Sequence, residues 1–98
     1  MKLRILTCRD DYLELEVLEE DIGVLDSLSE ILQKIDGVEY SGAIMEHPLT
    51  GRIILRVKTD AGRLRAVDAV KKAIQELKEI SAELRREFER FQKGGEET

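Results

Sequence analysis

Few residues of this 98-residue chain have side chains that could carry out chemistry. Cys8 is the single cysteine and His47 is the single histidine. Together they are too few for a tetrahedral zinc site, and one cysteine cannot form an intramolecular disulfide. His47 stands beside Pro48 in a short connection, where it more readily shapes a loop or touches a neighbouring molecule than acts as a base. The sequence therefore predicts no catalytic residue, no metal and no cofactor.

The charged residues argue against direct, specific binding of nucleic acid by this chain. The chain has 16 Lys+Arg and 21 Asp+Glu, which gives a net charge of −5, and affinity for phosphates comes mainly from Lys and Arg. A basic stripe of Arg52, Arg56 and Lys58 leaves a small RNA-binding domain as one hypothesis. Two Tyr and two Phe in the whole chain provide no aromatic platform on which bases could stack.

The length and hydropathy of the chain limit the classes of protein to which it can belong. A chain of this length forms one domain. No apolar run approaches the roughly 20 residues that span a bilayer, and the N-terminal residues lack the apolar stretch of a signal peptide. We therefore expect a cytoplasmic protein with no membrane contact.

Four segments alternate between apolar and polar residues with the period of a β-strand. In the second of them, Leu13, Leu15 and Val17 share one side. The first two segments are separated by a short polar turn, so they should pair antiparallel, with outward Lys and Arg facing outward Glu. The expected strands cover residues 2–7, 12–17, 38–45 and 52–59.

A helical period separates the second and third of these segments. Asp21 is a good N-cap residue, and Gly37 lies where a helix end needs a positive φ. Val24 and Ile31 widen the apolar stripe beyond its main line. That main line consists of Leu25, Leu28, Leu32 and Ile35.

A second helical period extends from about Arg63 to about Phe91 without an intervening Gly or Pro. About 28 residues give a rod of about 42 Å, whereas a domain of this size has a radius of gyration of about 13 Å. We therefore expect the helix to pass beyond its own sheet and to leave its distal apolar residues without an internal partner. The spaced apolar residues are Val67, Val70, Ile74, Leu77, Leu84, Phe88 and Phe91.

These elements predict an α+β fold in the order ββαββα. A four-stranded antiparallel sheet carries two helices on one face, and the C-terminal helix is long. We expect a single dimerisation domain over residues 1–92 and a flexible tail over residues 93–98. Leaving Phe88 and Phe91 in water would forfeit roughly 1.5–3 kcal/mol each. Because exposed apolar patches usually mark interfaces, the helices should dock onto another chain.

Five short segments carry a resemblance to a known family, and they are residues 12–16 (YLELE), 34–38 (KIDGV), 46–50 (EHPLT), 58–60 (KTD) and 68–74 (DAVKKAI). By these motifs the chain resembles archaeal DNA-directed RNA polymerase subunit L, and the resemblance covers the chain to about Phe91. That family is related to the eleventh subunit of eukaryotic RNA polymerase II and to the N-terminal domain of the bacterial α subunit. Where the family typically opens its first helix with Asp-His-Thr-Leu-Gly-Asn, residues 21–26 here read DIGVLD, which retains only Asp21 outright.

The resemblance implies a non-catalytic assembly subunit of a nucleotidyltransferase complex that acts in transcription. Such a subunit pairs through its two helices with the polymerase component designated D in archaea, which we call the D-type subunit. The heterodimer forms the platform for the large catalytic subunits. Glu46, His47 and Pro48 are candidates for contact with the large subunits. The implied partner interface consists of Asp21, Leu25, Leu28, Leu32, Val70, Ile74, Leu77, Leu84 and Phe88.

Two other functions stay open from the sequence. A stand-alone relative could form a homodimer through the same helices and have no role in a polymerase. The RNA-binding hypothesis, which uses the basic stripe on the open face of the sheet, is the third.

Overall fold

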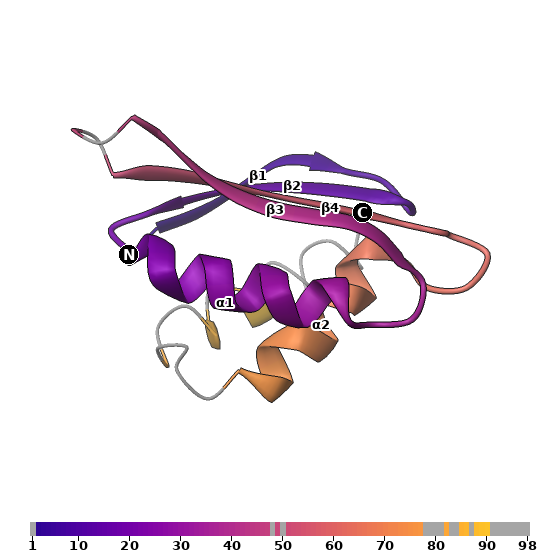
Figure 1. Ribbon diagram of the computed structural model, residues 1–98. Helices are drawn as coiled ribbons and strands as arrows, with labels where there is room; N and C mark the ends of the chain where they lie inside the picture. The colour runs from indigo at the N-terminus through magenta and orange to yellow at the C-terminus, as the bar shows by residue number, and fades with distance from the viewer. Residues whose placement is uncertain are drawn as a thin grey trace.

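Within the part of the chain that the structure describes, four antiparallel strands form one sheet, and the helices α1 and α2 lie on one of its faces (Figure 1). The computed structural model describes residues 2–47, 49, 51–77, 82, 85, 86 and 88–90. Its elements, in chain order, are β1 (Lys2–Cys8), β2 (Tyr12–Leu18), α1 (Ile22–Gln33), β3 (Val38–His47), β4 (Arg52–Thr59) and α2 (Ala66–Glu76). The four predicted strands are confirmed to within two residues at each end.

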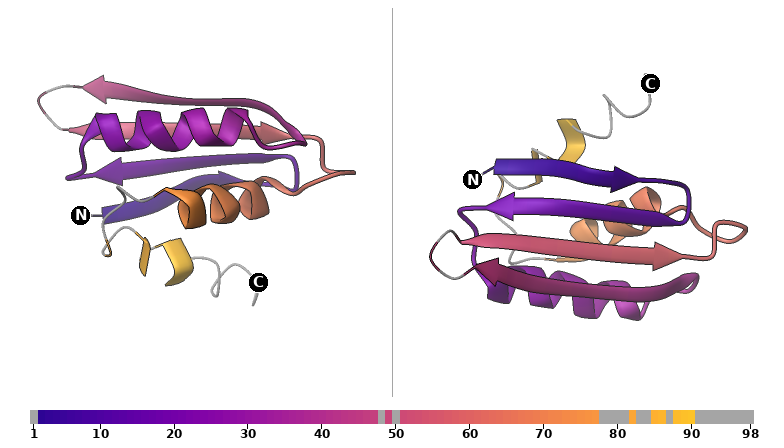
Figure 2. Two further views of the ribbon diagram at one scale, coloured as in Figure 1. Left: turned by 60° about the horizontal axis from the view of Figure 1, so that its bottom comes forward. Right: turned by 90° about the horizontal axis from the view of Figure 1, so that it is seen from above.

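The strands are arranged in the order β1-β2-β4-β3, and every neighbouring pair is antiparallel. The two hairpins therefore lie side by side, and α1 connects β2 to β3 across the face of the sheet (Figure 2). The predicted pairing of outward charges is confirmed at Arg4, which lies opposite Glu16. The second face of the sheet carries neither α1 nor α2, as Figure 2 also shows.

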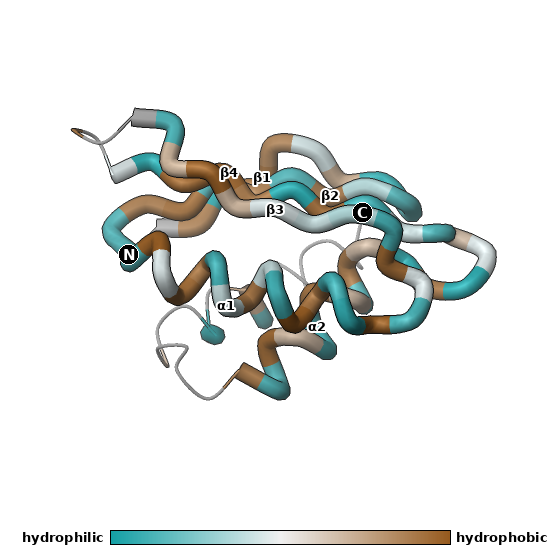
Figure 3. The backbone as a smooth tube through the Cα atoms, in the orientation of Figure 1, coloured by the Kyte–Doolittle hydropathy of each residue, from teal (hydrophilic) through white to brown (hydrophobic). Residues whose placement is uncertain are grey.

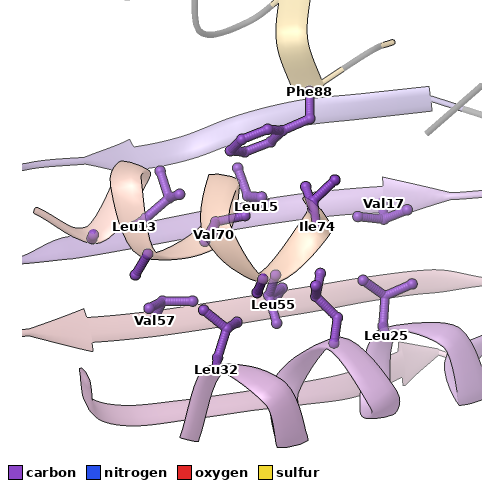
Figure 4. Packing of buried hydrophobic residues seen from close by; sticks show 14 of the residues in the cluster. Leu13, Leu15, Val17, Leu25, Leu32, Leu55, Val57, Val70, Ile74 and Phe88 are labelled. Atoms are coloured by element: carbon purple, nitrogen blue, oxygen red, sulfur yellow. The ribbon is translucent and has the colours of Figure 1, made fainter. Parts of the chain in front are cut away.

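Alternation along the strands places the apolar residues beneath the helices. Figure 3 shows hydrophobic and hydrophilic positions alternating along the sheet. Leu13 on β2 and Leu55 on β4 are at most 1% exposed, and Figure 4 shows them between the sheet and the helices. Burying a side chain of this size contributes about 1.5–3 kcal/mol. The core of the domain thus lies in a single layer between the sheet and the helices.

Helix α1 begins at the N-cap that the sequence predicted, but it ends at Gln33 with Lys34 as its C-cap, before Gly37 is reached. The Asp21 carboxylate accepts a hydrogen bond of 2.9 Å from the backbone N–H of Gly23, which confirms the predicted N-cap. Gly37 has a φ of +102° in the turn that follows the helix. A Cβ atom at Gly37 would lie 3.1 Å from the Cβ of Leu64, so glycine is needed there for space as well as for its backbone angle.

A buried polar link joins α1 to the edge strand β3. The Ser41 hydroxyl donates to the backbone carbonyl of Ser29 at 2.8 Å, and the two serine hydroxyls lie 3.1 Å apart. Both serines are 5% exposed. The Gln33 side-chain amide also donates to the Ser41 carbonyl at 3.2 Å. This link fixes the position of α1 over β3, and the apolar pattern of the sequence did not predict it.

The expectation of one long C-terminal helix is wrong in this structure. Helix α2 ends at Glu76, and Leu77 has an extended backbone with φ −81° and ψ 111°. Phe88, expected to project beyond the sheet, is 2% exposed and belongs to the core. The gain from burying an aromatic ring offsets the cost of interrupting the helix. Leu84, Phe91 and the predicted boundary between residues 92 and 93 lie outside the described residues.

Candidate partner interface

Most of the predicted interface residues cover the chain's own sheet. Each of those that the structure describes, apart from Asp21, is at most 5% exposed, whereas Asp21 is exposed and caps α1. The expectation that Phe88 lacks an internal partner is therefore wrong, and Leu84 lies outside the described part of the chain. The buried set consists of Leu25, Leu28, Leu32, Val70, Ile74, Leu77 and Phe88.

Other apolar residues on the helices are only partly buried. They flank the core on α1 and α2, and they are Ile22, Val24, Ile31 and Val67; Ile35, just after α1, is also partly buried. The sequence had shown Val24 and Ile31 beside the main apolar stripe. It did not show that this side of α1 reaches solvent while the main stripe faces the sheet.

A shallow groove lies where the end of α1 meets α2. Its lining combines Ile31 and Ile35 with charged residues of both signs. Apolar centres surrounded by polar rims are typical of protein interfaces. The groove can therefore receive apolar side chains of another protein. Its full lining is Ile31, Lys34, Ile35, Asp36, Lys72 and Glu76.

The opposite face of the sheet is crossed by its own ion pairs. The Arg52 guanidinium lies 2.5 Å from a Glu16 carboxylate oxygen and 2.7 Å from one of Glu46. Arg4 adds a longer pair of 3.6 Å to Glu16. The Glu16 side chain is only 10% exposed, so its charge requires such partners.

A second cluster on this face consists of Tyr12, Glu14 and Arg56. The Glu14 carboxylate accepts hydrogen bonds from Arg56 at 2.7 Å and from Tyr12 at 3.0 Å. The hydrogen bond from Arg56, followed by that from Tyr12, lowers the pKa of Glu14 below its ordinary value. Burial raises the pKa of Tyr12, and its hydrogen bond to Glu14 adds to the effect. Two of the three basic residues of the RNA-binding hypothesis, Arg52 and Arg56, are therefore already paired with carboxylates.

The hairpin that joins β3 to β4 contains the other predicted contact residues. Glu46 pairs with Arg52, and its side chain is 51% exposed. His47 is the last residue of β3, opposite Arg52, and Pro48 lies outside the described residues. Leu49 at the tip is 92% exposed.

The described residues contain no group of three or more His, Cys, Asp or Glu side chains that could hold a metal ion. None of the helices found among them is both long and apolar enough to cross a membrane.

Comparisons with known proteins identify the class to which this fold and this helix layer belong. Residues 12–87 match the RNA polymerase Rpb3/Rpb11 dimerisation domain. The chain belongs to this family of dimerisation domains.

Individual relatives narrow the assignment. The chain is 35% identical over 82 residues to DNA-directed RNA polymerase subunit Rpo11 of Saccharolobus shibatae, covering 84% of this chain and 88% of that protein. It is also 35% identical over 77 residues to a probable RNA polymerases I and III subunit RPAC2 of Caenorhabditis elegans, of which it covers 53%. The fold matches a crystal structure of RNA polymerase subunit L from Thermoplasma acidophilum, with a TM-score of 0.68 and 22% identity over 99% of this chain and 95% of that one. The chain is thus a homologue of the archaeal subunit Rpo11, or subunit L, and the resemblance noted from the sequence is confirmed.

Proposed function

We propose that this chain is a non-catalytic assembly subunit of a DNA-directed RNA polymerase. It pairs through its two helices with the D-type subunit, and the heterodimer is the platform on which the large catalytic subunits assemble. The observation that carries this proposal is the match of residues 12–87 to a polymerase dimerisation domain. The proposed place of action is the cytoplasm.

The helix layer supports pairing on this side of the molecule. Its groove exposes Ile31 and Ile35 among charged residues, whereas the opposite face of the sheet carries ion pairs that belong to the chain itself. Burying the groove against a second protein would remove apolar surface from water without separating any of those pairs. We propose that the partner first contacts Val24, Ile31 and Ile35.

The predicted interface residues have a supporting role in this proposal. Leu25 and Leu32 face the chain's own sheet, and Leu28 is buried in the same cluster, so these residues support the surface from below. The domain proposed over residues 1–92 contains this whole layer. Glu46, His47 and Pro48 lie at or beside the end of β3, far along the chain from the helices, and we propose this hairpin as the contact with the large subunits.

A charge placed in the groove tests the proposal. We expect Ile31→Arg to weaken binding to the D-type subunit at least about a hundredfold, because a guanidinium would be buried without a partner in the interface. The variant and the D-type subunit are co-expressed, and the dissociation constant of the purified proteins is measured by calorimetry. Circular dichroism and the urea midpoint of the variant establish that it folds.

The matched control is Ile44→Arg. Ile44 is on the outer face of β3 and is 49% exposed, so the same substitution there should leave binding within a factor of two or three. If folded Ile31→Arg binds the D-type subunit like the natural chain, the proposed surface is wrong. A chain that forms a stable homodimer and ignores the D-type subunit would instead support the stand-alone module.

A further inference from the structure

Strand β3 forms one edge of the sheet, and its middle lacks the features that commonly protect an edge strand. The order β1-β2-β4-β3 leaves one side of β3 without a neighbouring strand among the described residues. The strand spans ten residues and contains no Lys, Arg or Pro, the residue types that often blunt such edges. Its register with β4 shifts only near the two ends, between Val38 and Tyr40 and between Met45 and His47. The stretch between these shifts is a regular, open edge.

Hydrogen bonds show which backbone groups of β3 face the open side. The Gln33 side chain on α1 donates to the Ser41 carbonyl, so Ser41 is turned away from β4. Backbone direction alternates along a strand, so Ala43 and Met45 are turned the same way. The N–H of Thr59 agrees with this alternation, because it bonds to the turn before β2, and the β4 residues opposite Ala43 and Met45 therefore also point away from β3. The N–H and C=O groups of Ala43 and Met45 are thus available to another strand.

Apolar side chains line the outer face of the same strand. The large apolar side chains that are exposed in the described part of the chain all lie on β3 or at the tip of its hairpin, and they are Tyr40, Ile44 and Leu49. A Cβ atom at Gly42 would lie 2.8 Å from the Tyr40 hydroxyl oxygen, so this glycine leaves room for the Tyr40 side chain along the strand. Tyr40 and Ile44 therefore offer an apolar strip on which alternate side chains of an added strand can pack.

Carboxylates border the open edge on the inner side. Figure 2 shows α1 running beside β3. Asp26 and Glu30 lie seven and three residues before Gln33, so they share the side of α1 from which Gln33 reaches β3. Both are exposed, as is Glu39 on β3. The ion pairs found in the described residues involve none of these three carboxylates. Their charge attracts a basic partner and repels a second copy of this chain, whose own β3 would bring the same carboxylates.

We propose that the open edge of β3 binds an extended, basic segment of another protein as a fifth strand. Ala43 and Met45 exchange N–H···O=C hydrogen bonds with this segment. Its apolar side chains pack on the outer strip, and the Lys or Arg side chains that alternate with them face the three carboxylates. This surface is separate from the groove between α1 and α2, so the inference goes beyond the proposed function and does not depend on it.

A synthetic peptide, Lys-Val-Lys-Val-Lys-Val-Lys, is the probe, because it alternates basic and apolar residues in the period of a strand. Its binding to the isotope-labelled full chain is followed by nuclear magnetic resonance titration and by amide exchange. We expect a dissociation constant below about 1 mM, with slower exchange at the Ala43 and Met45 amides. A peptide with Glu in place of each Lys should bind at least about tenfold more weakly.

The variant Ala43→Pro tests the backbone contact. Proline removes an N–H that faces the open side and leaves the hydrogen bonds between β3 and β4 in place. We expect this variant to bind the peptide at least about tenfold more weakly, and circular dichroism and the urea midpoint establish that it folds. A folded Ala43→Pro variant that binds like the natural chain would overturn the inference.

The variant Glu30→Lys tests the charge without altering β3. It should weaken binding of the basic peptide about threefold to tenfold. Asp10→Lys is the matched control, because it makes the same change of charge at an exposed position in the turn between β1 and β2, and it should change binding by no more than about a factor of two. Equal effects of the two variants would overturn the inference. So would the absence of binding at millimolar peptide, or protection of the Ala43 and Met45 amides without peptide, which would mean that a second copy occupies the edge.

Discussion

At the scale of single residues, Glu14 is the side chain whose charge matters most to its surroundings. It accepts hydrogen bonds from Arg56 and Tyr12, and these hold its pKa below the ordinary value of 4.5. A carboxyl whose pKa is lowered by folding stabilises the native state above the unfolded value. That contribution is lost as the pH falls through the folded value.

We therefore expect Glu14→Gln to be less stable than the natural chain at pH 7, and the difference to shrink as the pH falls below 4.5. Urea denaturation at a series of pH values measures the difference. Glu30→Gln is the matched control, because Glu30 is exposed on α1 and should change stability little at any of these values. A Glu14→Gln deficit that stays constant from pH 7 to pH 3 would refute this account of the cluster.

At the scale of elements, the polar link between α1 and β3 is the contact that the apolar pattern does not explain. The Ser41 hydroxyl donates to the Ser29 carbonyl and lies within hydrogen-bond distance of the Ser29 hydroxyl inside the core, so the loss of the Ser41 hydroxyl removes a partner from both groups. We expect Ser41→Ala to reduce the free energy of unfolding by about 1–3 kcal/mol. The double variant Ser29→Ala/Ser41→Ala should lose less than the sum of the two single variants.

The urea midpoints of the three variants measure this coupling. Ser27→Ala is the control, because the Ser27 hydroxyl bonds only within α1, to the Gly23 carbonyl, in an exposed position. It should change stability by no more than about 0.5 kcal/mol. Strictly additive losses for Ser29 and Ser41 would mean that the two hydroxyls act independently.

The individual elements also show which structural features could be predicted from the sequence and which could not. Strand alternation, the Asp21 cap and the Gly37 turn are local signals, and all three are confirmed. The end of α2 at Glu76 and the contact of Phe88 with the core, twelve residues further along the chain, are not local signals. A periodic pattern cannot reveal such a contact, because the apolar spacing of a straight helix and of an interrupted one is the same.

At the scale of the whole molecule, the candidate site was harder to predict than the fold. The sequence identified the helices as the side that pairs, but it could not divide their apolar residues between the sheet and a partner. In the structure the central line, represented by Leu28, faces the sheet. The flanking line, represented by Ile31, reaches the groove. This division needs the rotation of α1 about its axis, which the Ser29–Ser41 link helps to set.

The proposed function requires a second protein on the helix layer. Membership of a polymerase dimerisation family, a helix layer with an apolar groove and an opposite face occupied by ion pairs all agree with this requirement. The proposed function assigns no catalytic step to this chain. We propose that its contribution to transcription is the burial of a helical surface shared with the partner.

Native mass spectrometry of this chain mixed with the D-type subunit from the same cell tests that claim most directly. We expect a single dominant species with the combined mass of one copy of each protein, and we expect it to persist when the mixture is diluted to nanomolar concentration. A spectrum that contains only the separate proteins, or a homodimer of this chain beside the free D-type subunit, would contradict the account.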